Sequence, residues 1–206
     1  NGNMVIDQRN AGASVTPTTN ATYTLDRWNF LLSASSKFST QQSSIAPSGF
    51  SSSNLVTSLS SYSSLAGDYF GLRQKIEGFN ISDLSWGTAG AFPVTLSFWV
   101  RSSLTGSFGG SIISTGASNY SYPFLYTINS VNTWEKFSVS VPANTFNTPS
   151  AGNASALEIC FDLGTGSNYS GTAGAWANSY KISATGATSV VGTSGATFYV
   201  TGVQLE

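Results

Sequence analysis

Residues 95–101 read Thr95-Leu96-Ser97-Phe98-Trp99-Val100-Arg101, with apolar side chains at every second position. A period of two is typical of a β-strand that buries one face, because successive side chains point to opposite sides. Leu96, Phe98 and Val100 therefore predict a core face. Trp99 and Arg101 share the other face, and a tryptophan beside an arginine is costly to leave in water. We expect a second layer or a partner to cover it.

Other apolar runs extend this pattern along the chain. They predict strands over residues 23–32, 55–65, 69–79, 95–101, 111–114, 120–128, 134–141, 157–163 and 196–205. Turn-forming residues separate the runs, and the Gly- and Ser-rich stretch 102–110 is itself predicted to be a turn. Pro123 cannot donate a ladder hydrogen bond, so its strand should lie at a sheet edge or carry a bulge. These features predict an all-β fold, a two-sheet antiparallel β-sandwich of jelly-roll type.

The predicted sandwich occupies residues 25–206, and residues 1–24 are predicted to form a polar N-terminal arm. Around Phe50 we expect a short strand within a Ser-rich loop region. The predicted core contains large aromatic side chains from several strands, namely Trp28, Phe98, Phe137, Phe161 and Phe198.

Composition supports this fold and argues against several partners. The 206 residues include 59 Ser and Thr and 21 Gly, and 40% are hydrophobic, which is too many for a disordered Ser-rich tract. The net charge is −1 and the eight Lys and Arg are scattered, so nucleic-acid binding is not expected. No run approaches about 18 apolar residues, so membrane insertion is not expected.

The single cysteine, Cys160, cannot form an internal disulfide, which is typical of a protein made in a reducing cytoplasm. The polar start of the chain shows no signal peptide. The chain has no His, so a Ser-His-Asp or Cys-His nucleophile in its usual form is not expected. The acidic residues are too dispersed to form a recognisable metal-binding loop, so no transition-metal site and no cofactor are expected. A calcium site is kept as a minor alternative.

Polysaccharide hydrolysis would need two carboxylates across the scissile bond, one of them with a raised pKa. Glu77 lies on one predicted strand face with Lys75 and Arg73, and Glu135 adjoins Lys136. Both acids are interpreted as surface charge partners. We therefore predict a protein that is not an enzyme.

Five phrases occur in an order that resembles a known family: residues 4–12, 23–28, 72–78, 96–106 and 201–206. Together they resemble the carbohydrate-binding-module-like jelly-roll domain of tail-fibre and other virion proteins of tailed bacteriophages, marine and cyanobacterial phages among them. The resemblance implies a virion surface protein, often a homotrimer, that contacts other virion proteins. It implies assembly in the host cytoplasm and an extracellular location afterwards. It supplies no sugar-contacting residues.

Pyranose rings stack on aromatic faces, and polar side chains bind their hydroxyls. The candidate glycan-binding residues are those that the strand pattern does not explain, together with one residue of the opening strand: Trp86, Tyr120, Tyr169, Trp176 and Arg101. For Trp86 and Trp176, a role as core plugs or subunit contacts is the favoured alternative. For Trp99 and Arg101 as well, the favoured alternative is a structural role, either within the sandwich or at a trimer contact.

The predicted function is recognition of a host-surface glycan by a tail-fibre domain. The alternative is a capsid decoration or head-fibre protein with a structural role, in which aromatic-rich strands would form subunit interfaces. A depolymerase is the third hypothesis.

Overall fold

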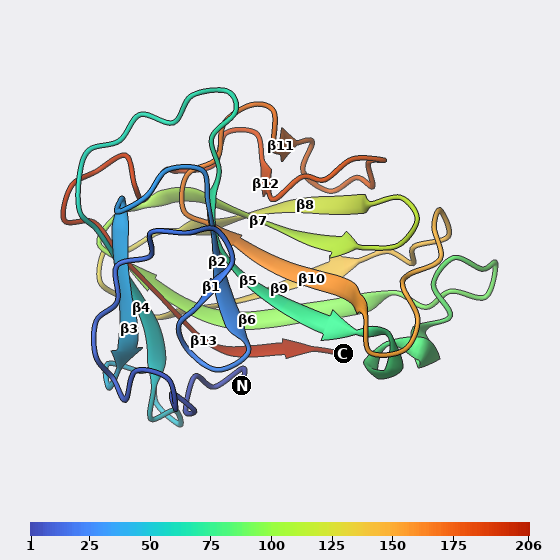
Figure 1. The fold of residues 1–206 in the computed structure, drawn as a ribbon, viewed down its shortest axis with the longest axis horizontal. Coiled ribbons are helices and arrows are strands. Elements are labelled where there is room, and N and C mark those ends of the chain that lie inside the picture. Colours follow the sequence, from blue (N-terminus) through green and yellow to red (C-terminus); the bar gives the residue numbers. More distant parts are fainter.

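The computed structural model describes residues 1–206 and consists almost entirely of strands and loops (Figure 1). The strands are β1 (Thr22–Tyr23), β2 (Trp28–Leu32), β3 (Phe38–Ser43), β4 (Ser53–Ser58), β5 (Phe70–Glu77), β6 (Val94–Ser102), β7 (Gly106–Ser114), β8 (Tyr120–Ile128), β9 (Glu135–Val141), β10 (Ser155–Asp162), β11 (Ser170–Gly171), β12 (Ser183–Ala184) and β13 (Thr197–Leu205). Two short 3-10 helices, η1 (Gly78–Asn80) and η2 (Ser82–Leu84), follow β5. No helix is long and apolar enough to cross a membrane.

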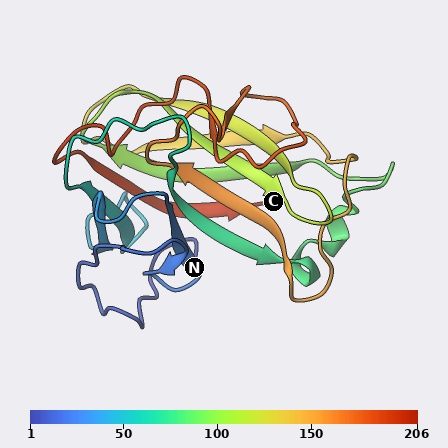
Figure 2. The same cartoon turned by 45° about the horizontal axis from the view of Figure 1, so that its top comes forward.

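The strands form two antiparallel sheets that face each other. One has the order β1-β2-β5-β10-β7-β8 and the other β3-β4-β13-β6-β9, and β11 and β12 make a separate two-stranded parallel pair. Figure 2 shows the two layers from a tilted view, with β5 and β10 in one and β13 in the other. The prediction of a two-sheet antiparallel jelly-roll sandwich is confirmed.

The core lies between the sheets and is dominated by aromatic rings. Leu96, Phe98 and Val100 are fully buried, as the alternation in β6 predicts. The ring of Phe98 lies 5.0–6.2 Å from four other rings, contributed by β8, β9 and β10: Phe124, Tyr126, Phe137 and Phe161. Offset and edge-to-face ring pairs of this kind add roughly 0.5–1.5 kcal/mol each beyond burial. The layer therefore joins both sheets through one residue.

The predicted core residues Trp28, Phe161 and Phe198 are fully buried, like Phe98. Phe137 packs against the same core but is only partly buried, because β9 is an edge strand. Pro123 lies in β8, the edge strand of the other sheet, as predicted.

Three local predictions are wrong. Residues 23–32 are not one strand, because β1 and β2 pair antiparallel across a turn in which Arg27 has φ +74°. The other two predictions concern residues without large side chains. Gly106–Gly110 belong to β7 and are not a turn. A Cβ atom at Gly110 would lie 2.6 Å from the carbonyl oxygen of Cys160, so a glycine is needed where β10 and β8 approach β7. Phe50 lies in a loop, and the strand of this region is β3. The small and polar residues of β3 show no apolar alternation, so its position could not be predicted.

Residues 1–24 lie against the sandwich. Met4 is fully buried within the main core cluster, and Val15 forms an isolated antiparallel bridge to Thr40 of β3. The indole N–H of Trp28 donates to the carbonyl oxygen of Asn1 at 3.1 Å. The first residues therefore contribute to the core.

The outer face of β6 is only partly covered, since Thr95, Ser97, Trp99 and Arg101 are all partly buried. The bulge in β13 between Thr201 and Gln204 contains Gly202 at φ +60°, where a Cβ atom would meet the Phe50 ring at 2.8 Å and Trp99 Cδ1 at 3.1 Å. Phe50 and Trp99 thus both lie against this glycine.

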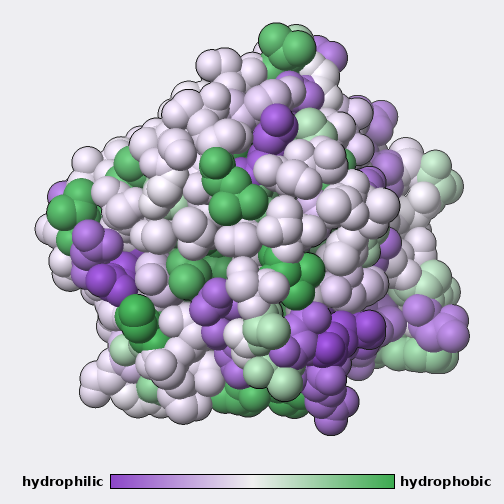
Figure 3. Space-filling view, turned by 60° about the vertical axis from the view of Figure 1, so that its left-hand side comes forward, coloured by the Kyte–Doolittle hydropathy of each residue, from purple (hydrophilic) through white to green (hydrophobic).

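The surface reflects the Ser- and Thr-rich composition. Figure 3 shows one side of the molecule, on which near-neutral residues dominate and apolar residues form separate small patches.

Replacement of Gly110 tests the close approach of β7 and β10. We expect Gly110→Ala to lower the free energy of unfolding by about 1–3 kcal/mol, since the added methyl group meets backbone and the Phe124 ring. Urea unfolding of Gly90→Ala is the control, because the nearest atom to a Cβ there is 3.9 Å away. Equal midpoints for the two variants would contradict the close packing.

Candidate functional site

The outer face of the six-stranded sheet carries a buried polar cluster. Asn29 of β2, Arg73 of β5 and Glu158 of β10 all point away from the core and are nearly inaccessible. Residues 164–192, between β10 and β13, run over this face and contain β11 and β12 (Figure 1). Ile182 from this segment packs on Leu31, Ile113 and Cys160 of the sheet.

Arg73 is held on three sides. Its Nε donates to Asn29 Oδ1 at 3.0 Å, and Nη1 donates to Glu158 Oε2 at 3.3 Å and to the Tyr180 hydroxyl at 3.1 Å. The Tyr180 hydroxyl in turn donates to Glu158 Oε2 at 2.6 Å. Burial opposes the charge of Arg73, but the attraction of Glu158 raises its pKa overall. Arg73 is therefore a fixed cation on a rigid sheet.

A pocket of about 260 Å³ opens above this cluster. We call it the tyrosine pocket; it is lined by Asn20, Leu31, Tyr69, Arg73, Tyr169, Tyr180 and Ile182. The rings of Tyr69 and Tyr169 meet edge to face at 5.0 Å. The pocket is slightly smaller than the range of about 300–1,000 Å³ typical of ligand sites, so it suits one sugar residue better than a long chain.

Four polar groups of the tyrosine pocket have no protein partner. They are the hydroxyls of Tyr69 and Tyr169, the Nδ2 of Asn20 and the Nη2 of Arg73; the other Asn20 amide atom, Oδ1, accepts from the Leu32 N–H. None of the four is among the fully buried atoms without partners, and all four belong to residues that line the pocket. Apolar rings beside convergent unpaired donors are what sugar recognition requires.

Asp162 fastens the covering segment to the sheet. Its Oδ1 accepts from the Gly164 N–H at 2.8 Å and the Thr165 hydroxyl at 2.6 Å, and its Oδ2 accepts from the Ser183 hydroxyl at 2.7 Å. Burial raises the pKa of this carboxyl above its ordinary value, although the hydrogen bonds act in the opposite direction.

Cys160 lies on the same outer face and is fully buried. Burial raises the pKa of its thiol, and the negative charge of Glu158 adds to the shift. The thiol of Cys160 is therefore protonated, and it acts as a buried packing group on this face of the sheet.

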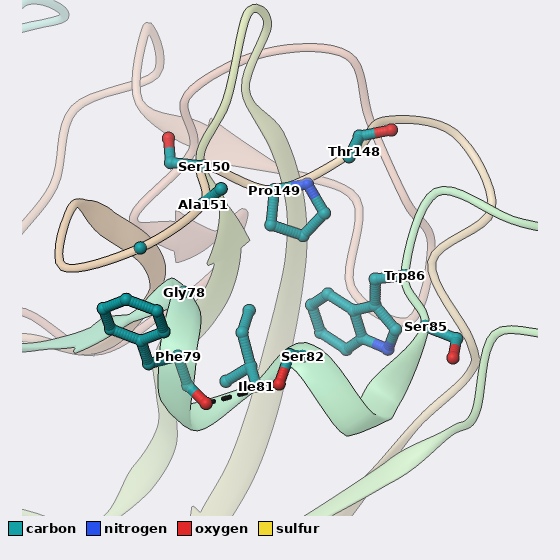
Figure 4. Close-up of a pocket in the computed structure, with 11 residues that line it drawn as sticks. Gly78, Phe79, Ile81, Ser82, Ser85, Trp86, Thr148, Pro149, Ser150 and Ala151 are labelled. Carbon is teal, nitrogen blue, oxygen red and sulfur yellow. Dashed lines mark hydrogen bonds between the residues drawn. The ribbon is translucent and has the colours of Figure 1, made fainter.

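A second pocket, of about 350 Å³, lies at the end of the sandwich between η1, η2 and residues 148–152 (Figure 4). Figure 4 shows Phe79, Ile81 and Trp86 on one side and Pro149 on the other. No charged side chain lines it. Phe79 is 74% exposed, but Trp86 is 3% exposed and its indole N–H donates to the Phe92 carbonyl oxygen at 2.8 Å. Trp86 therefore closes the base of this end pocket and offers no open face for stacking.

The other predicted residues lie in separate places. Tyr169 lines the tyrosine pocket. Trp176 is partly buried between Trp86 and Tyr122, at 5.6 and 5.5 Å between ring centroids, and donates to the Pro142 carbonyl oxygen. Tyr120 stacks on the exposed Phe146 at 5.4 Å and 5°.

Arg101 lies on the opposite sheet. Its Nε donates to the Asn132 carbonyl oxygen at 2.7 Å, and its guanidinium lies 5.1 Å from the ring centroid of Tyr199. The five predicted residues thus do not form one site, and their role in glycan binding stays a prediction.

Sequence reasoning missed Arg73, Tyr69 and Tyr180 as site residues. Tyr69, just before β5, and Arg73 are four residues apart and share the parity of the predicted strand 69–79, so this signal for a common outer face was available in the sequence. Nothing in the sequence placed Tyr180 against Arg73, because 107 residues separate them.

No family model matches the chain, and no curated protein matches it. Among solved structures, a protein from Bacteroides thetaiotaomicron proposed to bind sugar is 10% identical with a TM-score of 0.53, over 100% of this chain and 97% of that one. The enzymatically active domain of tailspike protein 4 of bacteriophage CBA120 is 14% identical with a TM-score of 0.50. That match covers 87% of this chain, which spans only 19% of the tailspike chain.

A family 11 carbohydrate-binding module from a Clostridium thermocellum cellulase is 12% identical with a TM-score of 0.43, over 94% of this chain and 95% of that one. The Bacteroides protein and the tailspike domain therefore resemble this chain in fold. Identities this low show the fold alone.

Substitution of Asp162 tests how the covering segment is held. An acid whose folded-state pKa is raised loses stability as pH rises from its ordinary pKa toward the raised value. We expect Asp162→Asn to remove this slope above about pH 4, because an amide keeps one acceptor and can donate to Ser183. Asp162→Ala should instead cost about 1–3 kcal/mol through lost hydrogen bonds. Urea unfolding at several pH values measures both, and parallel pH curves for wild type and Asp162→Asn would contradict the assignment.

Proposed function

We propose that this domain binds a glycan in the tyrosine pocket. The observation that carries the proposal is the set of unpaired polar groups around Tyr69 and Tyr169, held by Arg73 and Tyr180 on a rigid sheet. A sugar ring can pack its CH face on a tyrosine while its hydroxyls bond to Asn20 and the phenols. Solved proteins with the same fold that are named for sugar binding support this assignment.

We further propose that the glycan belongs to a host surface and that the domain is part of a phage virion, in a tail fibre. The ordered sequence phrases that resemble virion jelly-roll domains support this role, as does a bacteriophage tailspike with the same fold. In this proposal the chain forms a homotrimer beside other virion proteins, is assembled in the host cytoplasm and acts outside the cell.

The proposed domain is not an enzyme. A general acid needs a raised pKa, but the Arg27 hydrogen bond lowers the pKa of Glu77. Burial alone would raise the pKa of Glu135, yet hydrogen bonds from the Ser130 N–H and from Asn129 lower it overall. Both acids are therefore poorly suited to protonate a leaving group.

A structural role in a capsid decoration or head fibre is the second candidate. It is favoured by Phe79 and Phe146, which are 74% and 57% exposed. Apolar rings left in water are typical of surfaces that pack against another subunit. Imaging of particles would separate the two, since a position on the head favours the structural role.

Glycan binding is tested with an array of bacterial surface glycans and the variants Tyr69→Ala and Tyr169→Ala. Loss of one stacking ring removes about 1.5–3 kcal/mol of buried contact, so we expect each variant to bind roughly tenfold or more weakly. Tyr23→Ala, which removes an exposed tyrosine that does not line the pocket, is the matched control and should bind like wild type. Unchanged binding by both tyrosine variants would exclude the tyrosine pocket.

A further inference from the structure

The chemistry of the tyrosine pocket indicates which class of sugar it would bind. We propose that it takes an acidic sugar, with the sugar's carboxylate against Nη2 of Arg73; this rests on the glycan binding proposed above. The first reason is the lining itself. Arg73 is the only ionised side chain among the seven residues that line the pocket, and no acid is among them.

The second reason is the state of the guanidinium. Nε and Nη1 of Arg73 are occupied by Asn29, Glu158 and Tyr180, but Nη2 has no protein partner and is not enclosed. A guanidinium donates and never accepts, so the ligand must present an acceptor there. Arg73 itself is only 6% exposed, which limits water as a competitor.

The third reason is the charge balance beneath the pocket. Glu158 Oε2 lies 3.3 Å from Arg73 Nη1, and Oε1 of the same carboxylate lies 3.8 Å from Lys75 Nζ. Glu158 is therefore shared between Arg73 and Lys75, whose side chain is 40% exposed. A ligand carboxylate would give Arg73 a second charged acceptor on its free Nη2, which a neutral sugar cannot do.

Other acids nearby do not provide an acceptor for Nη2 of Arg73. Asp162 is next but one to Cys160 on the same outer face, but its oxygens are taken by Gly164, Thr165 and Ser183. Asp68 precedes Tyr69, and its oxygens accept from the Ser33 hydroxyl, the Tyr62 hydroxyl and the Leu65 N–H. Neither residue lines the pocket.

The fixed position of Arg73 favours binding of such a group. Asn29 and Tyr180 hold the guanidinium before any ligand arrives, so little side-chain freedom is lost on binding. A charge-assisted hydrogen bond in such a site corresponds to a gain of roughly 10- to 100-fold in affinity. The hydroxyls of Tyr69 and Tyr169 and the Asn20 amide remain for the ring hydroxyls.

The test compares matched ligands on the wild-type protein by calorimetry. The probes are oligomers of galacturonic acid, of mannuronic and guluronic acid, and of sialic acid, each beside its carboxyl-reduced neutral form, with a sulfated neutral oligosaccharide as a further arm. We expect at least one acidic oligomer to bind roughly 10- to 100-fold more tightly than its reduced form. That advantage should shrink as salt is raised from about 0.05 M to about 0.5 M, because screening weakens a charge interaction.

Variants locate the effect. Arg73→Gln should reduce binding of the acidic oligomer to the level of its reduced form, and Arg73→Lys should recover only part of the difference. Thermal unfolding checks that both Arg73 variants fold. The comparison of acidic and reduced ligands uses wild-type protein and does not depend on either variant. Lys136→Gln, on β9 of the opposite sheet, is the control for a general loss of positive charge.

The outcomes separate the two proposals. If reduced oligomers bind as tightly as acidic ones in a manner that Tyr169→Ala abolishes, the pocket binds neutral glycans and the acidic-sugar inference is overturned while glycan binding stands. Preference for the sulfated oligosaccharide would also overturn it. If no acidic, neutral or sulfated glycan binds in this comparison or on the array, both proposals fail.

Discussion

The aromatic layer centred on Phe98 is the constraint on which the rest of the structure depends. Four rings from β8, β9 and β10 surround it, and both sheets are fixed in spacing and register by their contacts. A chain with one cysteine has no internal disulfide that could hold the two sheets together. The layer also explains one glycine of β7, because a Cβ atom at Gly110 would meet the Phe124 ring, whereas one at Gly109 would meet Ser183 and Ala187 of the covering segment.

A rigid sheet makes the opposite face usable for recognition. The core side chains fix β2, β5 and β10 in place, so that Asn29, Arg73 and Glu158 on the outer face have fixed separations. The covering segment then adds Tyr169 and Tyr180 from above. Side chains from a sheet and from a long connection thus meet in the tyrosine pocket, each positioned by a different part of the fold.

Alternation in the sequence was enough to predict the sandwich, because Leu96, Phe98 and Val100 on one face and Tyr122, Phe124 and Tyr126 on another leave little choice. It could not predict β3 or the start of β7, where small and polar residues carry no periodic signal. Of the residues that line the tyrosine pocket, only Tyr169 was predicted from the sequence as a glycan-binding residue. Aromatic content in loops was the wrong guide for Trp86, since a loop indole can fill a core as readily as it can face a ligand. Contacts such as Tyr180 on Arg73 depend on how a long connection folds back, and that is a tertiary property.

The hydrogen bonds of Tyr180 have a mechanical consequence. This residue lies in the covering segment, yet its hydroxyl is bonded to both Arg73 and Glu158 of the sheet. Anything that contacts Tyr69 and Tyr169 together would bridge the residue just before β5 and the covering segment at the same junction. A ligand in the proposed pocket would therefore favour closure of the segment on the sheet, and closure would favour the ligand. A force applied across this junction would have to break the hydrogen bonds of Tyr180 together with the contacts of any bound ligand.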